Sequence, residues 1–216
     1  MVSLTMSDFF NYPSPKLVVD CVVFGFTDDK IKILLSKRNI EPFLNCWALP
    51  GGAVFVGESV EEAATRKLIK EGGLKAILEQ HQVYSNKDRD PRGHVVSVAF
   101  SAFVKPTEVT LVKPEEAKES AWFDIDKLPD MAFDHKTIVK DCQNNLKHKL
   151  NNIGKNLLPK TFTLAMLQKL YEVINGKKLD KPNFRKLILA SNIIEGTGKK
   201  IKGTRFRSPE LFKFKS

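Results

Sequence analysis

The residues best suited to chemistry lie within residues 51–74, where a glycine turn precedes a helix rich in charged side chains. Gly51 and Gly52 permit the positive φ angles and close backbone approaches that other residues resist. A second pair, Gly72 and Gly73, is predicted to end the helix. Between the two pairs lie Glu58, Glu61, Glu62, Arg66, Lys67, Lys70 and Glu71. Carboxylates on one helix face could hold a divalent cation, whereas lysines there would favour an anion.

This spacing resembles the Nudix box, Gly-x5-Glu-x7-Arg-Glu-U-x-Glu-Glu-x-Gly-U, in which U is a bulky aliphatic residue. The residues in register with it are Gly52, Glu58, Arg66, Leu68, Glu71, Gly73 and Leu74. Lys67 and Lys70 stand where the pattern has glutamate. The resemblance implies the Nudix fold, an α/β/α sandwich with a mixed sheet, and it implies that the hydrolase chemistry is impaired.

The two lysines argue against metal-dependent hydrolysis. In Nudix hydrolases the glutamates matching positions 67, 70 and 71 share one helix face and hold Mg²⁺ against a diphosphate. The neighbouring Glu58, Glu61 and Glu62 are expected to project away from that face. Glu71 alone would make a poor magnesium site, so we expect no catalytic residues, no metal and no cofactor. A Mg²⁺-dependent hydrolase of a nucleoside diphosphate derivative is the alternative.

The charge of the chain is concentrated near its carboxyl end. The net charge is +10, and residues 151–216 hold 15 Lys and Arg against 4 Asp and Glu. Residues 1–150 hold 20 basic and 21 acidic residues and are almost neutral. Because basic surfaces attract phosphate backbones, the last third is predicted to bind nucleic acid. A merely solvated basic surface would be the simpler explanation if no motif accompanied it.

Composition excludes several other classes of protein. No apolar run approaches the length of a bilayer and no secretory signal is evident, so no membrane partner is expected. Cys21, Cys46 and Cys142 are odd in number and never spaced as Cys-x-x-Cys, which indicates reduced thiols in a cytoplasmic protein.

Apolar runs at residues 17–26 and 31–38 predict a hairpin, and two candidate ligand residues lie on it. Asp20 interrupts the first run. It is either a buried carboxylate tied to backbone amides or a ligand acceptor. Arg38 ends the second run beside the glycine turn and is the stronger ligand candidate of the two.

A strand is predicted to start at Val83 and Tyr84, and a charged loop at residues 86–93 separates it from a strand predicted at 95–104. Its Asp88, Arg89 and Asp90 either form a surface salt-bridge cluster or bind sugar hydroxyls and phosphates. The family resemblance described below favours binding. A late strand is predicted within 115–123. Asp134 is then expected to cap a helix running to about residue 150. His135 could act as an acid or base, although a single histidine in a first helical turn more often packs or hydrogen-bonds.

The chain changes character beyond a linker predicted at residues 151–156. A helix capped by Thr163 ends at Gly176, a basic helix begins at Asp180, and a Gly/Lys/Arg-rich hairpin follows. This is the order of a winged helix-turn-helix, whose second helix enters the major groove while the wing lies on the backbone. The predicted groove residues are Lys181, Asn183, Arg185 and Lys186; the predicted phosphate contacts are Lys199, Lys200, Lys202, Arg205 and Arg207.

Taken together, the two halves resemble the Nudix-related transcriptional regulators, which join a catalytically decayed Nudix domain to a C-terminal winged helix. The residues that carry this resemblance are 20–26, 37–39, 88–91, 133–135, 157–160, 162–164 and 183–186. They lean toward the arabinose-responsive repressors of Bacteroidetes more than toward the ADP-ribose-sensing regulators of NAD metabolism. The resemblance implies an α+β fold, with residues 1–152 for effector binding and dimerisation and 153–216 for DNA binding.

The resemblance also implies a homodimer that binds a palindromic double-stranded DNA operator and releases it when a sugar or nucleotide-sugar effector occupies the Nudix pocket. The effector residues would be Asp20, Arg38, Lys67, Glu71, Asp88, Arg89, Asp90, Asp134 and His135. A diphosphate ligand would use Lys67 and Lys70 as counter-charges, whereas a neutral pentose would need hydrogen bonds from Asp and Arg. The effector would act by shifting the population of winged-helix arrangements. A scaffold that only dimerises would instead bind no small molecule.

Overall fold

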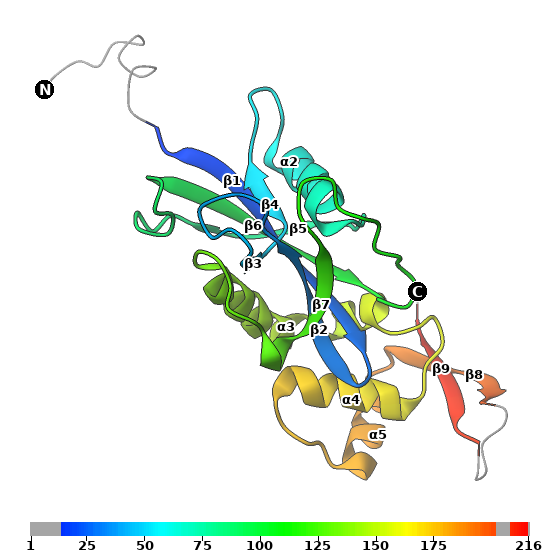
Figure 1. Cartoon of the computed structure of the whole chain (residues 1–216). Helices are drawn as coiled ribbons and strands as arrows, with labels where there is room; N and C mark the ends of the chain where they lie inside the picture. The colour runs from blue at the N-terminus through cyan, green and yellow to red at the C-terminus, as the bar shows by residue number, and fades with distance from the viewer. Residues whose placement is uncertain (1–13, 202–207, 216) are drawn as a thin grey trace, which may run out of the picture.

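The computed structural model describes residues 14–201 and 208–215, and its elements are labelled in Figure 1. The Nudix-like half contains β1 Lys16–Thr27, β2 Lys30–Lys37, β3 Trp47–Ala48, β4 Gly51–Ala53, α2 Val60–Lys67, η1 Leu68–Gly72, β5 Glu79–Tyr84, β6 Val95–Val104, β7 Ser120–Asp124 and η2 Ile125–Lys127. It is followed by α3 His135–Leu157, α4 Leu164–Asn175, α5 Lys181–Ala190, β8 Ile194–Lys200 and β9 Glu210–Phe214.

The first half is built on a mixed sheet. Its main order is β3-β2-β1-β6-β5, with β4 also paired to β1 and β7 to β2. β1 and β6 run parallel, and the other pairs are antiparallel. Since β1 lies inside the sheet and both of its faces are covered, the strand is apolar almost throughout instead of alternating.

Helices cover both faces of this sheet. Val19, Cys21 and Val23 of β1 pack with Ala63 and Ala64 of α2. The alternate β1 side chains, such as Val22 and Phe24, belong to the cluster that contains α3. Side chains of a strand point alternately to opposite faces, so one apolar run supplies two cores. The α/β/α sandwich predicted from the sequence is confirmed.

The β1–β2 hairpin is also confirmed, and its turn is made by acidic residues in an unusual conformation. Asp28 and Asp29 have φ angles of 52° and 58°. Two consecutive positive φ values match the type I′ turns that suit the twist of hairpins, and aspartate tolerates them better than most residues.

Two strands differ from the sequence prediction at their ends. β5 begins at Glu79, ahead of the predicted start at Val83, and contains a register shift between Gln80 and Val83. β7 begins only at Ser120. The amides of Glu115 and Glu116 instead donate to the Lys70 carbonyl oxygen, at 2.8 and 3.1 Å, so this segment joins η1 and does not extend the sheet.

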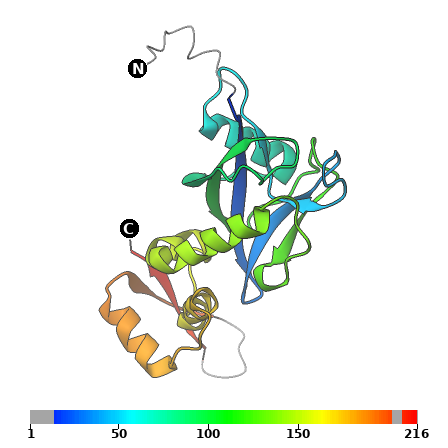
Figure 2. The ribbon, with the colours of Figure 1, turned by 90° about the vertical axis from the view of Figure 1, so that its left-hand side faces the viewer.

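The linker predicted at residues 151–156 is wrong, because α3 continues through it to Leu157. Ile153 and Leu157 are almost fully buried and keep the helix in contact with both halves of the chain. Figure 2 shows α3 crossing beside the sheet toward the unit made by α4 and α5. Within the described residues, no helix is apolar enough over a sufficient length to cross a bilayer.

The last third folds as the predicted winged helix. The Thr163 side chain caps α4 by accepting from the Met166 amide at 3.2 Å, and Gly176 ends α4 at φ 67°. Asp180 caps α5 in the same way, through the Asn183 amide at 3.0 Å. β8 and β9 then pair antiparallel.

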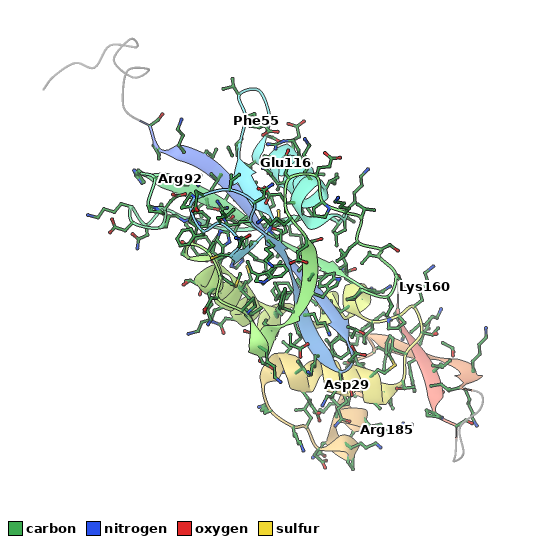
Figure 3. The ribbon with its side chains drawn as sticks, viewed as in Figure 1. Asp29, Phe55, Arg92, Glu116, Lys160 and Arg185 are labelled. Carbon is green, nitrogen blue, oxygen red and sulfur yellow. The ribbon has the colours of Figure 1, made fainter. Side chains whose placement is uncertain are left out.

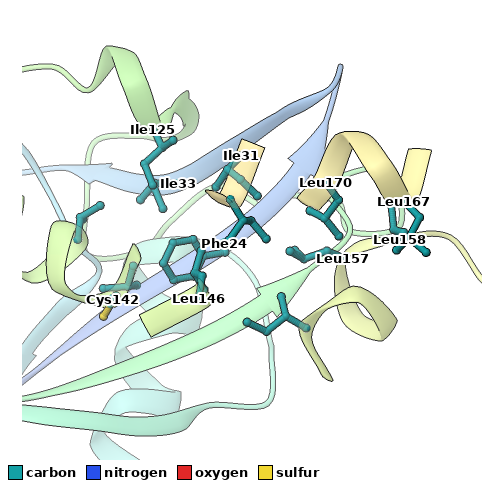
Figure 4. Packing of buried hydrophobic residues seen from close by; sticks show 14 of the residues in the cluster. Phe24, Ile31, Ile33, Ile125, Cys142, Leu146, Leu157, Leu158, Leu167 and Leu170 are labelled. Atoms are coloured by element: carbon teal, nitrogen blue, oxygen red, sulfur yellow. The ribbon is translucent and has the colours of Figure 1, made fainter. Parts of the chain in front are cut away.

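The winged helix shares its hydrophobic core with the Nudix half. Phe24 and Ile31 from the β1–β2 hairpin belong to the same buried cluster as Leu157, Leu167 and Leu170 (Figure 4). Because one apolar cluster spans both halves, we infer that they are rigidly connected and not joined by a flexible tether.

Candidate functional site

The glycine turn is fixed by its pairing with β1. Gly51 lies opposite Asp20, and Gly52 lies opposite Val19. A Cβ atom on Gly51 would lie 2.6 Å from the Asp20 carboxylate and 2.4 Å from the Val19 carbonyl oxygen, so a larger residue does not fit. The turn therefore brings the Nudix-box segment against a buried carboxylate of β1.

The helix after this turn is positioned by its ends. Ser59 and Glu62 form a capping box, with Ser59 Oγ accepting the Glu62 amide at 3.2 Å and Glu62 Oε2 accepting the Ser59 amide at 2.7 Å. Residues 68–72 continue α2 as a wider π-type turn that ends at Gly73, where φ is 73°. The Glu58 carboxylate is held by the Arg66 guanidinium, with Nε to Oε2 at 3.0 Å.

Lys67, Lys70 and Glu71 lie together as the sequence predicts, and Glu116 joins them from the segment before β7. Lys67 Nζ donates to Glu71 Oε1 at 3.0 Å and to Glu116 Oε2 at 2.8 Å. Lys70 Nζ donates to Glu116 Oε1 at 3.0 Å. Sequence reasoning missed Glu116, because no local pattern connects it to the helix.

This set of side chains does not fit a Mg²⁺ ion. The ammonium of Lys67 lies between the Glu71 and Glu116 carboxylates and engages the oxygens that a metal would need. Burial alone would lower the pKa of Lys67, but Glu71 and Glu116 outweigh it and raise the pKa, so the lysine stays charged. Among the described residues, no group of three or more His, Cys, Asp or Glu is arranged to hold a metal.

Asp20 is a buried carboxylate held by side chains and not by backbone amides. Its Oδ2 accepts from Ser97 Oγ at 2.6 Å and from the Arg89 guanidinium at 3.2 Å. Its Oδ1 lies 3.3 Å from His135 Nε2. Burial would raise the pKa of Asp20, but His135, Ser97 and Arg89 together lower it to about 2.

His135 serves here as a connector between elements. Its Nδ1 accepts the Leu49 amide at 2.9 Å, which places the ring hydrogen on Nε2, facing Asp20. The side chain is 4 % exposed. The histidine thereby ties the first turn of α3 to β1 and to the segment after β3.

Arg89 fixes the charged loop to β1 and to the start of α3. Its Nε and an Nη donate to the two oxygens of Asp134, at 2.9 and 2.7 Å, in addition to the contact with Asp20. Asp134 does occupy the N-cap position of α3, but its side chain makes no capping hydrogen bond. A buried guanidinium between two carboxylates rigidifies the loop more than it offers a free ligand group.

The rest of the loop divides between internal and exposed groups. The buried Asp90 accepts from the Arg92 amide and side chain, with a closest contact of 2.7 Å. Asp88 is exposed. The loop is therefore neither a simple surface salt-bridge cluster nor a set of unoccupied binding groups.

The ring of Phe133 packs against residues from several loops of the site. Phe133 has a strained φ of 55° and carries the guanidinium groups of Arg38 and Arg92 at 4.8 and 5.6 Å from its ring centre. The Phe43 ring meets it edge-on at 4.8 Å. Arg92, Phe43 and Phe133 were not predicted as site residues, because contacts between distant loops leave no local signal.

Two adjoining cavities surround this ring. The smaller, of about 60 Å³, is lined by residues that include Asp20, Arg38, Glu71, Arg89, Asp90 and His135. The larger, of about 400 Å³, is lined by Phe43, Asn86, Asp88, Arg89, Pro91, Phe133 and Asp134. The structure thus brings all the predicted effector residues to one neighbourhood, with Lys67 attached through Glu71.

The predicted DNA-binding residues that the structure describes lie far from this site. Figure 3 labels Arg92 and Glu116 in the Nudix half and Arg185 on α5 at the opposite end of the molecule. On α5, Phe184 and Ile188 are buried, while the predicted groove residues are all exposed: Lys181, Asn183, Arg185 and Lys186. Lys199 and Lys200 are exposed at the end of β8. Lys202, Arg205 and Arg207 lie outside the described residues.

Comparison with known families matches both halves of the chain. The NUDIX domain model matches residues 15–142, and the model of the NrtR DNA-binding winged helix domain matches residues 154–214. The chain belongs to the Nudix family and carries an NrtR-type winged helix. This combination agrees with the order of the elements described above.

Individual relatives support the same assignment. The ADPR responsive transcriptional repressor NtrR of Acinetobacter baylyi is 32% identical over 94% of this chain and 84% of its own length. Shewanella oneidensis NrtR, solved with a 27mer DNA, superposes with a TM-score of 0.74 at 29% identity, over 92% of this chain and 93% of its own. Its NUDIX domain, solved with ADP ribose, superposes with a TM-score of 0.58 at 27% identity, over 66% and 99%.

An enzyme is similar to the Nudix half. An ADP-ribose pyrophosphatase of Methanocaldococcus jannaschii is 46% identical over 134 residues, 60% of this chain and 74% of the relative. The A. baylyi repressor and the M. jannaschii enzyme are both named for ADP-ribose, and one of the two Shewanella structures contains it. None of these relatives supports the arabinose-responsive branch that the sequence motifs suggested.

Proposed function

We propose that this protein is a transcriptional repressor that binds operator DNA through its winged helix and releases it when ADP-ribose occupies the Nudix pocket. The similarity to an ADP-ribose-responsive repressor over almost the whole chain supports this effector. L-Arabinose, which the sequence motifs favoured, is the competing effector. The protein is proposed to act in the cytoplasm as a homodimer on a palindromic operator.

The DNA-binding face is proposed to be α5 and the β8–β9 wing. α5 buries one face and exposes Lys181, Asn183, Arg185 and Lys186 on the other, which suits a helix that enters the major groove. The exposed Lys199 and Lys200 would contact phosphates from the wing, together with Lys202, Arg205 and Arg207.

The effector is proposed to lie across both cavities, because the smaller one by itself has too little volume for a nucleotide sugar. Arg38 and Arg92, held on Phe133, supply positive charge for a phosphate group of the effector. The exposed Asp88 would accept a sugar hydroxyl. The Asp20, Arg89, Asp134 and His135 network would shape the cavity wall, and Glu71 would hold Lys67 beside the turn.

The observation that carries the regulatory part of the proposal is the path of α3. The helix begins with His135 inside the proposed pocket and ends with Leu157 in the core shared with the winged helix. A ligand that displaces the first turn would therefore alter the packing of the winged helix at the other end. Such an effector favours one of two arrangements and lowers the population that fits the operator.

The test is an anisotropy titration of an operator selected from random duplexes, with and without ADP-ribose or L-arabinose. ADP-ribose should release the DNA and L-arabinose should not. Lys199→Ala/Lys200→Ala should weaken binding and reduce the slope of log K against log salt by about 2, because these two wing lysines are the proposed phosphate contacts. The control is Lys127→Ala/Lys136→Ala, which removes two exposed lysines from the Nudix half. An unchanged slope in the wing variant would remove these two lysines from the DNA interface.

A Nudix hydrolase is the second candidate, favoured by the identity to the M. jannaschii ADP-ribose pyrophosphatase. The Lys67 ammonium between Glu71 and Glu116 opposes it. Incubation of the protein with ADP-ribose and Mg²⁺ discriminates the two. Sustained release of AMP would establish the hydrolase despite the lysines.

A further inference from the structure

One carboxylate in the Nudix half bridges two ammonium groups. Glu116 Oε2 accepts from Lys67 at 2.8 Å, and Glu116 Oε1 accepts from Lys70 at 3.0 Å. Each oxygen serves one lysine, which is also how two oxygens of a phosphate group would be bound. The pKa of Glu116 is lowered by its hydrogen bonds to Lys67 and Lys70, so the carboxylate is ionised near neutral pH.

We propose that Glu116 is an internal substitute for a phosphate group, and that a phosphate or diphosphate displaces it to bind Lys67 and Lys70 without a metal ion. This inference builds on the proposed effector pocket, because Glu71 both lines that pocket and holds Lys67. It assigns to the two lysines the counter-charge that a divalent cation supplies in Nudix hydrolases.

The exposure of the side chains favours such an exchange. The Lys67 side chain is 13 % exposed, whereas that of Glu116 is 36 % exposed and lies on the solvent side of the pair. Lys70 is exposed to a similar degree, 38 %. An anion arriving from solvent therefore meets Glu116 and Lys70 before Lys67.

The segment that carries Glu116 is held by its backbone, so the carboxylate can leave without the segment detaching. The Glu115 and Glu116 amides bond to the Lys70 carbonyl oxygen, and the Val112 amide bonds to the Gly73 carbonyl oxygen at 2.9 Å. Further along, the Lys118 amide donates to the Lys37 carbonyl oxygen at 3.0 Å. Only a rotation of the Glu116 side chain is needed to vacate the space between the lysines.

The exchange replaces one anionic partner of the two lysines by another. With Glu116 in place, two ammonium groups face the carboxylates of Glu71 and Glu116, and Glu115 stands 3.9 Å from Lys70. A diphosphate carries more negative charge than one carboxylate and therefore attracts the same lysines more strongly, while the displaced Glu116 turns to solvent, where its charge is screened. Lys67 meanwhile keeps Glu71 as a partner.

The test is calorimetric titration of the full chain with inorganic pyrophosphate in the presence of EDTA. The unaltered protein should bind, and Glu116→Gln should bind about three- to tenfold more tightly, because the internal competitor has lost its charge. The matched control is Glu119→Gln, in the same segment, where the carboxylate pairs with Lys37 at 3.0 Å. This control should leave the affinity unchanged.

A second variant keeps the test decisive if Glu116→Gln folds poorly. Lys70→Gln should weaken pyrophosphate binding by a similar factor, with its fold checked by thermal unfolding. The proposal would be overturned if a folded Glu116→Gln protein bound pyrophosphate no more tightly than the unaltered protein. It would also be overturned if the unaltered protein bound pyrophosphate only when Mg²⁺ was present. Because no DNA or ADP-ribose is used, a failure of effector-controlled DNA release would be recognised separately.

Discussion

The charge of Asp20 should stabilise the fold by an amount that depends on pH. Its pKa is about 2 in the folded protein and 3.8 in the absence of structure. The difference corresponds to about 2 kcal/mol of stabilisation near neutral pH. Because the folded pKa is the lower one, this stabilisation is complete well above pH 3.8 and is lost as the pH falls toward 2.

Asp20→Asn tests this directly, because asparagine has the shape of the neutral carboxyl group. Asparagine keeps one acceptor oxygen, so only one side of the carboxylate, facing either Ser97 or His135, still accepts a hydrogen bond. Arg89 loses one of its two charged partners. We expect unfolding in urea to require about 2 kcal/mol less free energy at pH 7, a fall in midpoint of about 1 M. At pH 3 the loss should be roughly half as large.

The measurement is urea unfolding followed by tryptophan fluorescence and far-UV circular dichroism at both pH values. Asp126→Asn, at an exposed position, is the control and should change stability by less than about 0.5 kcal/mol. A loss for Asp20→Asn below that limit, or a loss that does not shrink at pH 3, would refute the electrostatic account of this buried network.

Two other predictions concern packing. Leu157→Ala should lower stability by about 2–5 kcal/mol, in one transition seen by both fluorescence and circular dichroism, since the two halves share a core; separate transitions would contradict the shared core. Gly73→Ala should destabilise more than Gly176→Ala, although both glycines have φ near 70°. Only at Gly73 would the new Cβ meet a backbone oxygen, that of Val112, at 2.2 Å. Thermal unfolding of the two glycine variants would measure the difference. Equal losses of stability would show that the positive φ angle, and not the contact with the Val112 oxygen, causes the destabilisation.

Much of the fold could be predicted because its signals are local. The caps at Thr163 and Asp180 act on amides three residues away, and the hairpin and winged helix follow from short apolar runs and glycines. The arabinose branch shows the limit of this reasoning. Short motifs shared by related regulators indicate the family more readily than they distinguish its effectors.

The extent of α3 could not be predicted from its own residues. The polar stretch at 151–156 is typical of a linker, yet Ile153 and Leu157 are buried and the helix continues. Packing against two halves of one core stabilises these turns more than local propensity opposes them. The same helix then connects the pocket to the winged helix, a connection that no local pattern encodes.

The sequence by itself determined that the glutamates of a Nudix box are replaced at Lys67 and Lys70 and that positive charge gathers in the last third. Only the tertiary structure decided which carboxylate side chains pair with those lysines. The sheet and its connections bring Glu116 to Lys67 and Arg89 to Asp20, pairs separated by 49 and 69 residues. Contacts over such distances depend on strand order and register, which are fixed by burial of the whole core and leave no trace in any short segment.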